Sequence, residues 1–314
     1  MKIAVLFPGQ GSQYLGMGQE FIKSDRSCAS LMEVAESVCD FPLQKITAEG
    51  PMEELTRAVH LQPAITVTNL ICWQALQNAL GDSLQVACFA GHSLGEYSAL
   101  NAAGVLTVED TIRLVARRGA LMEREGLKNP GGMRAVLGLD IAAIDLLIAD
   151  YTGDGVVTAA NHNTPEQIVI SGSLEALEAV SKMAEEKGAK VIALNVNVAN
   201  HSPLVADAVP DFAAFVREIA FKIPQVPVYF NVSARVESDT DVIRNMVARQ
   251  IASKVRWCEI ISTMIEGGVD TFIEVGPKTV LKGMMRKIVP AGVKVNVLQF
   301  DSPQTLAACL EKLG

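Results

Sequence analysis

The sequence predicts an α/β fold: a mainly parallel sheet covered by helices on both faces, with a smaller unit inserted into the chain. Short apolar runs alternate with stretches of helical spacing along most of the sequence, as in parallel sheets. Near residues 129–132 the predicted helices and strands become shorter, and longer ones return near residue 201. A chain of 314 residues, 49% hydrophobic and 20% charged, can fill a core of this size.

The N-terminal part begins with an apolar run over residues 3–7, which we interpret as a buried first strand. Residues 18–40 and 51–60 have helical spacing, and residues 63–80 form a long apolar stretch typical of a buried helix. A second strand from residue 86 stops at Gly91, a helix follows from residue 94 to Gly104, and another helix spans residues 108–125.

The inserted unit has its own pattern. We expect strands over residues 133–139, 155–161, 167–172 and 191–198, with helices over 141–150 and 174–187. This β-α-β-β-α-β order is that of a ferredoxin-like unit of about seventy residues. We therefore expect a small domain at residues 128–200 and a large domain made of residues 1–127 and 201–314.

The C-terminal part returns to alternating elements. We expect helices over residues 205–219, 241–251, 259–266 and 279–288, and strands over 226–231, 271–275 and 293–298.

Composition excludes several classes of protein. The net charge of −8 disfavours a nucleic-acid partner. No apolar run is long enough to span a membrane, and the N-terminal run is too short for the core of a signal peptide. The six cysteines are scattered, without a C-x-x-C pair or a cluster with histidine. We expect reduced, mostly buried thiols in a cytoplasmic protein and no metal site.

The clearest motif is G-x-S-x-G, with Ser93 between Gly91 and Gly95. A strand before it and a helix after it are the context of a nucleophile elbow, where the serine lies on a sharp turn and glycines avoid collisions. The helix would direct free N–H groups at the serine oxygen. The alternative is a tight turn that happens to contain serine.

A second glycine loop follows the first strand, at residues 8–13. Tyr14 stands where a dinucleotide-binding loop has its third glycine, and no Walker lysine follows. We therefore disfavour a cofactor phosphate. A loop that brings main-chain N–H groups close to an anion remains open.

A serine nucleophile needs a base, and the chain has four histidines. We favour His201, because it lies where the chain passes from the small to the large domain and so borders the interdomain cleft. His92 is next to Ser93 on the same turn, His162 lies between two small-domain strands, and His60 lies at a helix end. The aspartates between Ser93 and His201 are expected in solvent (Asp140, Asp145, Asp150 and Asp154), so a Ser–His dyad is better supported than a triad.

Seven segments together resemble one family, the malonyl-CoA:acyl-carrier-protein transacylases of bacterial type II fatty acid synthesis. They occur in the family's order over nearly the whole chain: FPGQGSQ at 7–13, GHSLGE at 91–96, RG at 118–119, GGM at 131–133, HSPL at 201–204, VRW at 255–257 and EVGP at 274–277. The resemblance implies a hydrolase-like α/β domain with a ferredoxin-like insert, in agreement with the pattern above.

The resemblance also implies roles. Ser93 matches the acylated serine, His201 the general base, and Gln250 the residue whose main-chain carbonyl orients that histidine. Gln10 and Leu94 match the two main-chain N–H donors of the oxyanion hole, where losing one donor typically costs about 3–4 kcal/mol.

Arg118 matches the arginine that binds the free carboxylate of the malonyl group; without the resemblance we would place it on a helix surface. An uncharged acyl chain would leave this guanidinium unpaired. We also expect substrate contacts from Met122 and Asn161. His162 and Asn200 depart from the family pattern and could narrow or polarise the acyl pocket, as Arg134 departs from it beside the glycine pair.

The expected reaction moves a malonyl group from malonyl-CoA to the phosphopantetheine thiol of acyl carrier protein through a malonyl-serine, supplying fatty acid synthesis. We expect no permanently bound cofactor and a monomer. Alternatives are the same chemistry in a polyketide pathway, a serine thioesterase, and a carrier-binding module without catalysis.

The carrier protein of this pathway is acidic, and so is this chain overall. Docking would then need a local basic patch. The candidates are Arg117, Lys278, Lys282, Arg286 and Lys287; the alternative is an ordinary solvated helix face.

Overall fold

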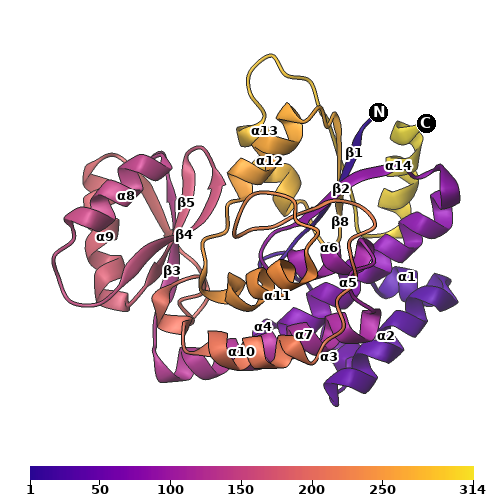
Figure 1. Cartoon of the computed structure of the whole chain (residues 1–314), viewed down its shortest axis with the longest axis horizontal. Coiled ribbons are helices and arrows are strands. Elements are labelled where there is room, and N and C mark those ends of the chain that lie inside the picture. The colour runs from indigo at the N-terminus through magenta and orange to yellow at the C-terminus, as the bar shows by residue number, and fades with distance from the viewer.

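The computed structural model describes residues 1–314, with the side chain of Asp82 left outside the description. The chain forms two separate sheets, a larger one on the right of Figure 1 and a smaller one on the left.

The larger sheet holds strands from both ends of the chain. Its order is β7-β2-β1-β8-β9, and all neighbouring strands run parallel. The strands are β1 (Ile3–Phe7), β2 (Val86–Gly91), β7 (Val228–Tyr229), β8 (Thr271–Val275) and β9 (Asn296–Phe300). The predicted mainly parallel sheet is confirmed.

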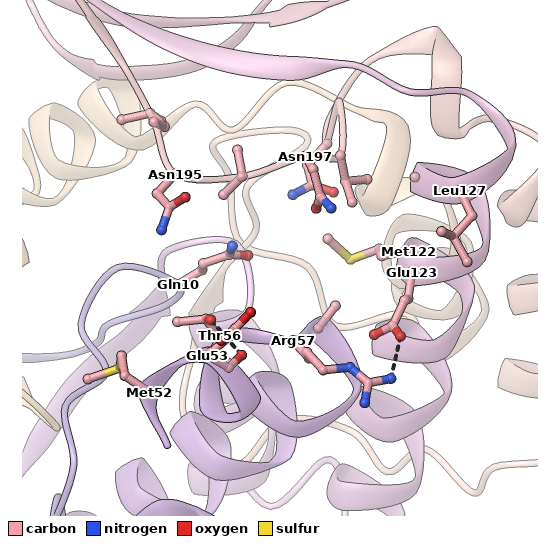
Figure 2. Close-up of a pocket in the computed structure, with 16 residues that line it drawn as sticks. Gln10, Met52, Glu53, Thr56, Arg57, Met122, Glu123, Leu127, Asn195 and Asn197 are labelled. Atoms are coloured by element: carbon pink, nitrogen blue, oxygen red, sulfur yellow. Dashed lines mark hydrogen bonds and ion pairs between the residues drawn. The ribbon is translucent and has the colours of Figure 1, made fainter. Parts of the chain in front are cut away.

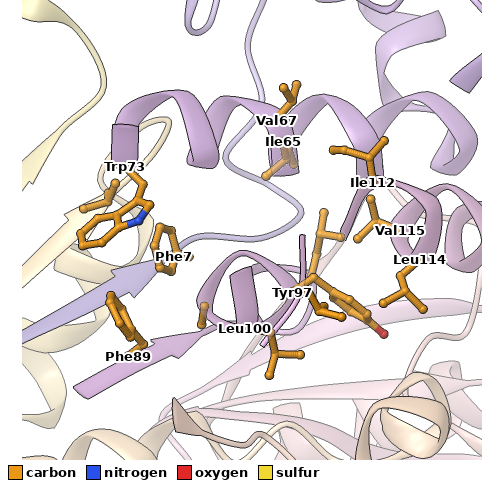
Figure 3. Close-up of a cluster of buried hydrophobic side chains, with 14 of the residues drawn as sticks. Phe7, Ile65, Val67, Trp73, Phe89, Tyr97, Leu100, Ile112, Leu114 and Val115 are labelled. Atoms are coloured by element: carbon orange, nitrogen blue, oxygen red, sulfur yellow. The ribbon is translucent and has the colours of Figure 1, made fainter. Parts of the chain in front are cut away.

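Helices cover both faces of this sheet because its strands are apolar on both sides. Along β1, Val5 and Phe7 contact the cluster formed with the N-terminal helices, whereas Ala4 and Leu6 contact the cluster formed with the C-terminal helices. Figure 3 shows the first cluster, where Trp73 packs edge-on against Phe89 with ring centroids 5.3 Å apart. A sheet buried on both faces requires this continuous apolar pattern.

The N-terminal helices form the first of these layers. They are α1 (Gln19–Ser24), α2 (Arg26–Cys39), α3 (Leu43–Glu49), α4 (Met52–Thr56), α5 (Ala58–Leu80), the 3₁₀ turn Gly81–Ser83, α6 (Gly95–Ala102) and α7 (Val108–Lys128). The expected helix over 18–40 is two helices, because the Asp25 side chain accepts the Ser27 N–H and starts a new one.

The smaller sheet is antiparallel throughout, in the order β4-β5-β3-β6. Its elements are β3 (Gly132–Leu137), α8 (Ile141–Asp150), β4 (Val157–Thr164), β5 (Gln167–Gly172), α9 (Leu174–Glu186) and β6 (Lys190–Ala193). This is the ferredoxin-like arrangement that the element order predicts. The expected fourth strand is shorter than 191–198, since the chain leaves the sheet after Ala193 and runs toward the large sheet.

The C-terminal part contains α10 (Ala208–Arg217), α11 (Thr240–Arg249), α12 (Trp257–Glu266), α13 (Val280–Ile288) and α14 (Pro303–Leu313), with 3₁₀ turns at Pro203–Val205 and Gln250–Ala252. The sequence patterns missed α3 and α14, and they predicted a last strand that begins three residues before β9 and ends two residues before its end. The expected strand at 226–231 pairs over two residues only.

Main-chain hydrogen bonds link β4 of the small sheet to the segment that precedes α12. Val255, just before α12, pairs with Asn161 of β4; the His162 N–H donates to the Val255 carbonyl at 2.9 Å, and the Val255 N–H donates to the Ala160 carbonyl at 2.8 Å. These bonds hold β4 beside the large sheet, so β4 can supply side chains to a site between the two.

All six cysteines are free thiols, and five are buried. Among the described residues, no three histidine, cysteine, aspartate or glutamate side chains gather as a metal site would require. No described helix is both long and apolar enough to cross a membrane.

Candidate active site

Ser93 lies on the sharp turn between β2 and α6. Its φ is +47°, a left-handed conformation that a residue other than glycine adopts only at some cost. A Cβ on Gly91 would lie 1.9 Å from the Gly95 carbonyl carbon, and a Cβ on Gly95 would lie 2.0 Å from the Phe7 oxygen. Both flanking glycines are therefore required for this turn to close against β1.

The side chain of Ser93 meets that of His201. Ser93 Oγ lies 2.8 Å from His201 Nε2, across 108 residues of sequence. His201 Nδ1 lies 3.0 Å from the Gln250 carbonyl oxygen and 2.9 Å from the Ser253 carbonyl oxygen. Since carbonyl oxygens only accept, Nδ1 must carry the proton, which leaves the Nε2 lone pair facing the serine hydroxyl.

His201 is buried, and its main-chain φ of +59° turns it toward the cleft. Burial, followed by the nearby Arg118 charge, lowers its pKa to about 3. The imidazole is therefore neutral at neutral pH and able to accept a proton.

Arg118 comes from α7 and is 1% exposed. One terminal nitrogen donates to Ser93 Oγ at 3.0 Å and to Gln250 Oε1 at 3.2 Å, and the other donates to Gln62 Oε1 at 3.0 Å. In the described part of the chain this guanidinium forms no ion pair. A buried cation beside the serine hydroxyl, held by neutral amides, is suited to an incoming carboxylate.

Two main-chain N–H groups belong to residues that line the same cavity as Ser93. Gln10 and Leu94 both line the cavity with Ser93, and among the described residues neither N–H has an acceptor. The loop approaches closely because residue 9 is glycine: a Cβ there would lie 2.4 Å from the His92 carbonyl oxygen. Unused N–H groups at this position fit an oxyanion better than a cofactor phosphate.

The cavity above Ser93 has a volume of about 300 Å³. Arg118, Met122 and His201 line it from the large-sheet side, and Asn161, Asn163 and Asn200 from the small-sheet side. The Oδ1 atoms of Asn161 and Asn200 are buried and have no partner among the described residues. Both of these unpartnered oxygens belong to residues that line the cavity.

A wider opening of about 770 Å³ adjoins this cavity, and Gln10, Met122, Asn195 and Asn200 line both. Figure 2 shows the chain that carries Asn195 and Asn197 facing the helices across this opening, with the Arg57–Glu123 ion pair at the opposite side. The two spaces together can admit a long, thin ligand whose end reaches Ser93.

The other histidines lie apart from Ser93 Oγ. His92 Nε2 lies 2.8 Å from Asn163 Oδ1 and its ring packs on Trp257, while His60 lies in the first turn of α5 against the Glu54 carbonyl. Neither faces the serine hydroxyl.

The expectation that His162 lines the acyl pocket is wrong. Its side chain points away from the cavity, with Nδ1 3.1 Å from Glu259 of α12. Side chains alternate along a strand, so Asn161 and Asn163 face the cavity and His162 faces α12. Arg134 likewise lies elsewhere, in an ion pair with Glu178.

The basic residues expected to dock the carrier protein lie in two separate places. Lys282 and Arg286 lie one turn apart on α13, whose Val280, Leu281 and Met284 line the cavity, and Lys278 lies in the turn just before this helix. None of these three cations forms an ion pair with a described residue. Arg117 is exposed on α7, a different helix, so it does not belong to that row.

Sequence patterns missed several groups that touch the reactive atoms. Asn231 Oδ1 accepts the Ser93 N–H at 2.7 Å, Gln62 Oε1 holds Arg118, and the Ser253 carbonyl shares the His201 proton. Buried amides inside apolar stretches were the available signal: Gln62 in the long helix, and Asn231 after an apolar run.

The chain is similar to known proteins over nearly its whole length. Residues 5–298 match the acyl transferase domain family. The malonyl CoA-acyl carrier protein transacylase of Bacillus subtilis is 36% identical over 314 residues, which cover 99% of this chain and 97% of the relative.

The chain belongs to the malonyl CoA-acyl carrier protein transacylase family. Solved structures of the family agree in fold. The acyl carrier protein S-malonyltransferase of Vibrio cholerae has a TM-score of 0.92 at 34% identity, covering all of both chains. A malonyl-transacylase solved in complex with its type II PKS acyl-carrier protein has a TM-score of 0.94 at 34% identity, covering 99% of this chain and all of that one. Membership of the family makes this protein an acyltransferase.

Proposed function

We propose that this enzyme transfers the malonyl group of malonyl-CoA to the phosphopantetheine thiol of acyl carrier protein through a malonyl ester of Ser93. The product would supply fatty acid synthesis. The observation that carries the proposal is Arg118: a buried guanidinium without a carboxylate partner, 3.0 Å from the serine hydroxyl. The malonyl carboxylate provides the missing counter-charge, and an uncharged acyl group does not.

In the first half-reaction, Ser93 Oγ attacks the thioester carbonyl while its proton moves to His201 Nε2. The negative charge that forms on the carbonyl oxygen is stabilised by the N–H groups of Gln10 and Leu94. The carbon–sulfur bond then breaks, and the CoA sulfur takes the proton from His201. A malonyl-serine ester is left, with its carboxylate on Arg118.

In the second half-reaction, the phosphopantetheine thiol gives its proton to His201 and its sulfur attacks the ester. The ester bond to Ser93 breaks, and Oγ recovers the proton. Gln250 and Ser253 carbonyls hold the Nδ1 proton throughout, so no carboxylate is needed to orient His201.

The phosphopantetheine arm is common to both substrates. We propose that the free oxygens of Asn161 and Asn200 accept hydrogen bonds from its amide N–H groups. The small unit, residues 128–200, forms one side of the cleft and limits access of water, which would otherwise hydrolyse the ester. Lys282 and Arg286 are carried by α13, whose apolar residues line the cavity, and we propose that these cations meet the acidic carrier protein.

Intact-mass measurement after mixing with malonyl-CoA tests the proposal. The wild type gains the mass of one malonyl group, Ser93→Ala gains none, and added holo carrier protein removes the adduct while becoming malonylated. An unmodified wild type, or an adduct that survives Ser93→Ala, contradicts it. Rapid release of free malonate in the absence of carrier protein indicates a thioesterase instead.

A further inference from the structure

Glu96 is a buried carboxylate, 1% exposed, three residues after Ser93 in the first turn of α6. Among the described residues it forms no ion pair. Its two oxygens accept three hydrogen bonds from amide groups: Oε2 accepts the Asn231 main-chain N–H at 2.6 Å and Asn231 Nδ2 at 2.5 Å, and Oε1 accepts Gln250 Nε2 at 2.9 Å. Both amide residues are fully buried and both touch the reacting groups.

Asn231 connects this carboxylate to the nucleophile. Its Nδ2 donates to Glu96 and to the Gly91 carbonyl oxygen at 2.8 Å, so its Oδ1 must face the opposite way. There Oδ1 accepts the Ser93 N–H at 2.7 Å. The Ser93 main chain is thereby held in its left-handed conformation, while the N–H groups of Gln10 and Leu94, which line the same cavity, keep no acceptor among the described residues.

Gln250 connects the same carboxylate to the base and to Arg118. Its Nε2 donates to Glu96 and to the Ser93 carbonyl oxygen at 3.0 Å, so its Oε1 faces Arg118 and accepts a hydrogen bond at 3.2 Å. Its main-chain carbonyl accepts the His201 Nδ1 proton. Reversing this side-chain amide would turn an NH₂ group toward the guanidinium, where two donors would oppose each other.

We propose that Glu96 is a positioning residue for acyl transfer, because its carboxylate accepts hydrogen bonds from both the Asn231 and the Gln250 amides and, with the main-chain groups of Gly91 and Ser93, fixes the way both face, so that Ser93, His201 and Arg118 are oriented together. The argument assumes the acyl transfer proposed above. An ionised carboxylate can only accept hydrogen bonds, which excludes the reversed orientation of either amide. A glutamine at the same place can both donate and accept, and it loses that selectivity without changing the size of the side chain.

The charge of Glu96 also supports its positioning role. The Glu96 carboxylate and the buried Arg118 guanidinium attract each other, and the Gln250 side chain hydrogen-bonds to both; the charge of Glu96 also acts on Tyr97, the next residue of its helix. Burial raises the pKa of Glu96 to about 7, while the hydrogen bonds from Asn231 and Gln250 and the Arg118 charge oppose that rise. Protonation of Glu96 would place an O–H donor against the N–H groups of Asn231 and Gln250. It would therefore weaken the hold on these two amides, as glutamine at this position would.

The test compares Glu96→Gln with Glu96→Asp, and uses Glu125→Gln as the control. Glu125 is a buried carboxylate of α7 that pairs with Arg124 and does not line the cavity. Rapid-quench mass spectrometry at saturating malonyl-CoA gives the rate of malonyl-serine formation, and thermal melting gives stability. We expect Glu96→Gln to lower the acylation rate about 10²-fold. Glu96→Asp should recover most of this loss, and Glu125→Gln should keep the wild-type rate.

Two readouts separate positioning from simple destabilisation. In the wild type the acylation rate should fall as pH decreases through about 7, toward the rate of Glu96→Gln, whose own rate stays level until His201 protonates at lower pH. The losses from Glu96→Gln and Asn231→Ala should also be far from additive, because both break the same connection to Ser93.

A folded Glu96→Gln enzyme that acylates within about threefold of the wild type, with an unchanged pH profile, overturns the proposal. A rate loss that only follows the folded fraction, as melting reports it, also overturns it. Phenylmethylsulfonyl fluoride labelling of Ser93 separates failure of this proposal from failure of the proposed function, since it needs the serine–histidine geometry but no malonyl group. Slow labelling of Glu96→Gln supports positioning even if the wild type forms no malonyl ester, and equal labelling of both contradicts it.

Discussion

The two sides of the cavity differ in the chemistry they supply. The large-sheet side carries the serine hydroxyl, the neutral imidazole and the buried guanidinium, all connected through Gln250. The small-sheet side carries neutral amides, of which Asn161 and Asn200 have free oxygens. Groups that change charge or exchange protons thus lie on one side, supported by a sheet buried on both faces. The other side shapes the cavity. Substitutions on the large-sheet side should therefore change reaction rates far more than those opposite.

The largest effect is expected from His201→Ala, because Ser93 Oγ then has no base within hydrogen-bond distance. Formation of the malonyl-enzyme should slow about 10³- to 10⁴-fold, as measured by rapid quench and mass spectrometry. The control is His60→Ala, which removes a histidine outside the cavity. Rapid acylation of the His201→Ala enzyme would mean that another group takes the proton.

Arg118→Gln should come next, with a loss of about 10²- to 10³-fold in kcat/KM for malonyl-CoA, since the substrate carboxylate would be buried without a counter-charge. Acetyl-CoA should be used at least as well as by the wild type, because no guanidinium is left unpaired. Competition between the two substrates measures this ratio. The exposed neighbour Arg117→Gln is the control, and an equal loss for both acyl groups would argue against carboxylate recognition.

A smaller effect is expected across the cavity. Asn200→Ala removes one free acceptor, and a single hydrogen bond contributes about 0.5–1.5 kcal/mol. We expect a rise in KM of up to about tenfold for both malonyl-CoA and carrier protein, with kcat nearly constant, because the contact is to the arm that the two substrates share. A loss in kcat/KM for malonyl-CoA as large as that of Arg118→Gln, arising from kcat, would remove the distinction between the two sides.

The smallest effect should come from the surface. Lys282→Glu on α13 reverses one partly exposed charge and should raise KM for the acidic carrier protein a few-fold, more at low salt than at high salt. The malonyl-CoA half-reaction should be unaffected, so the two half-reactions are measured separately. Arg117→Glu, on a different face, is the matched control. An equal effect of both changes would place the docking surface elsewhere.

Local sequence was enough to predict the elements that depend on neighbours in the chain. The strand–glycine–serine–glycine–helix pattern predicted the turn at Ser93, because a side chain at either glycine would collide with the main chain whatever the rest of the fold does. The shorter strands and helices of the inserted unit, in the order β-α-β-β-α-β, predicted the antiparallel small sheet in the same way. Strand ends were less accurate, since pairing partners decide where a strand stops.

The tertiary structure alone decided which polar groups meet. Ser93 and Asn231 are 138 residues apart in sequence, and Glu96 and Gln250 are 154 apart, so no local pattern relates them. The side to which His162 points depends on how β4 pairs beside Val255, and sequence spacing did not reveal that register. The sequence by itself determined where the chain turns and which residue types are available for the reaction. Hydrogen bonding between buried groups, which must find partners wherever the fold brings them, decided how those residues act together.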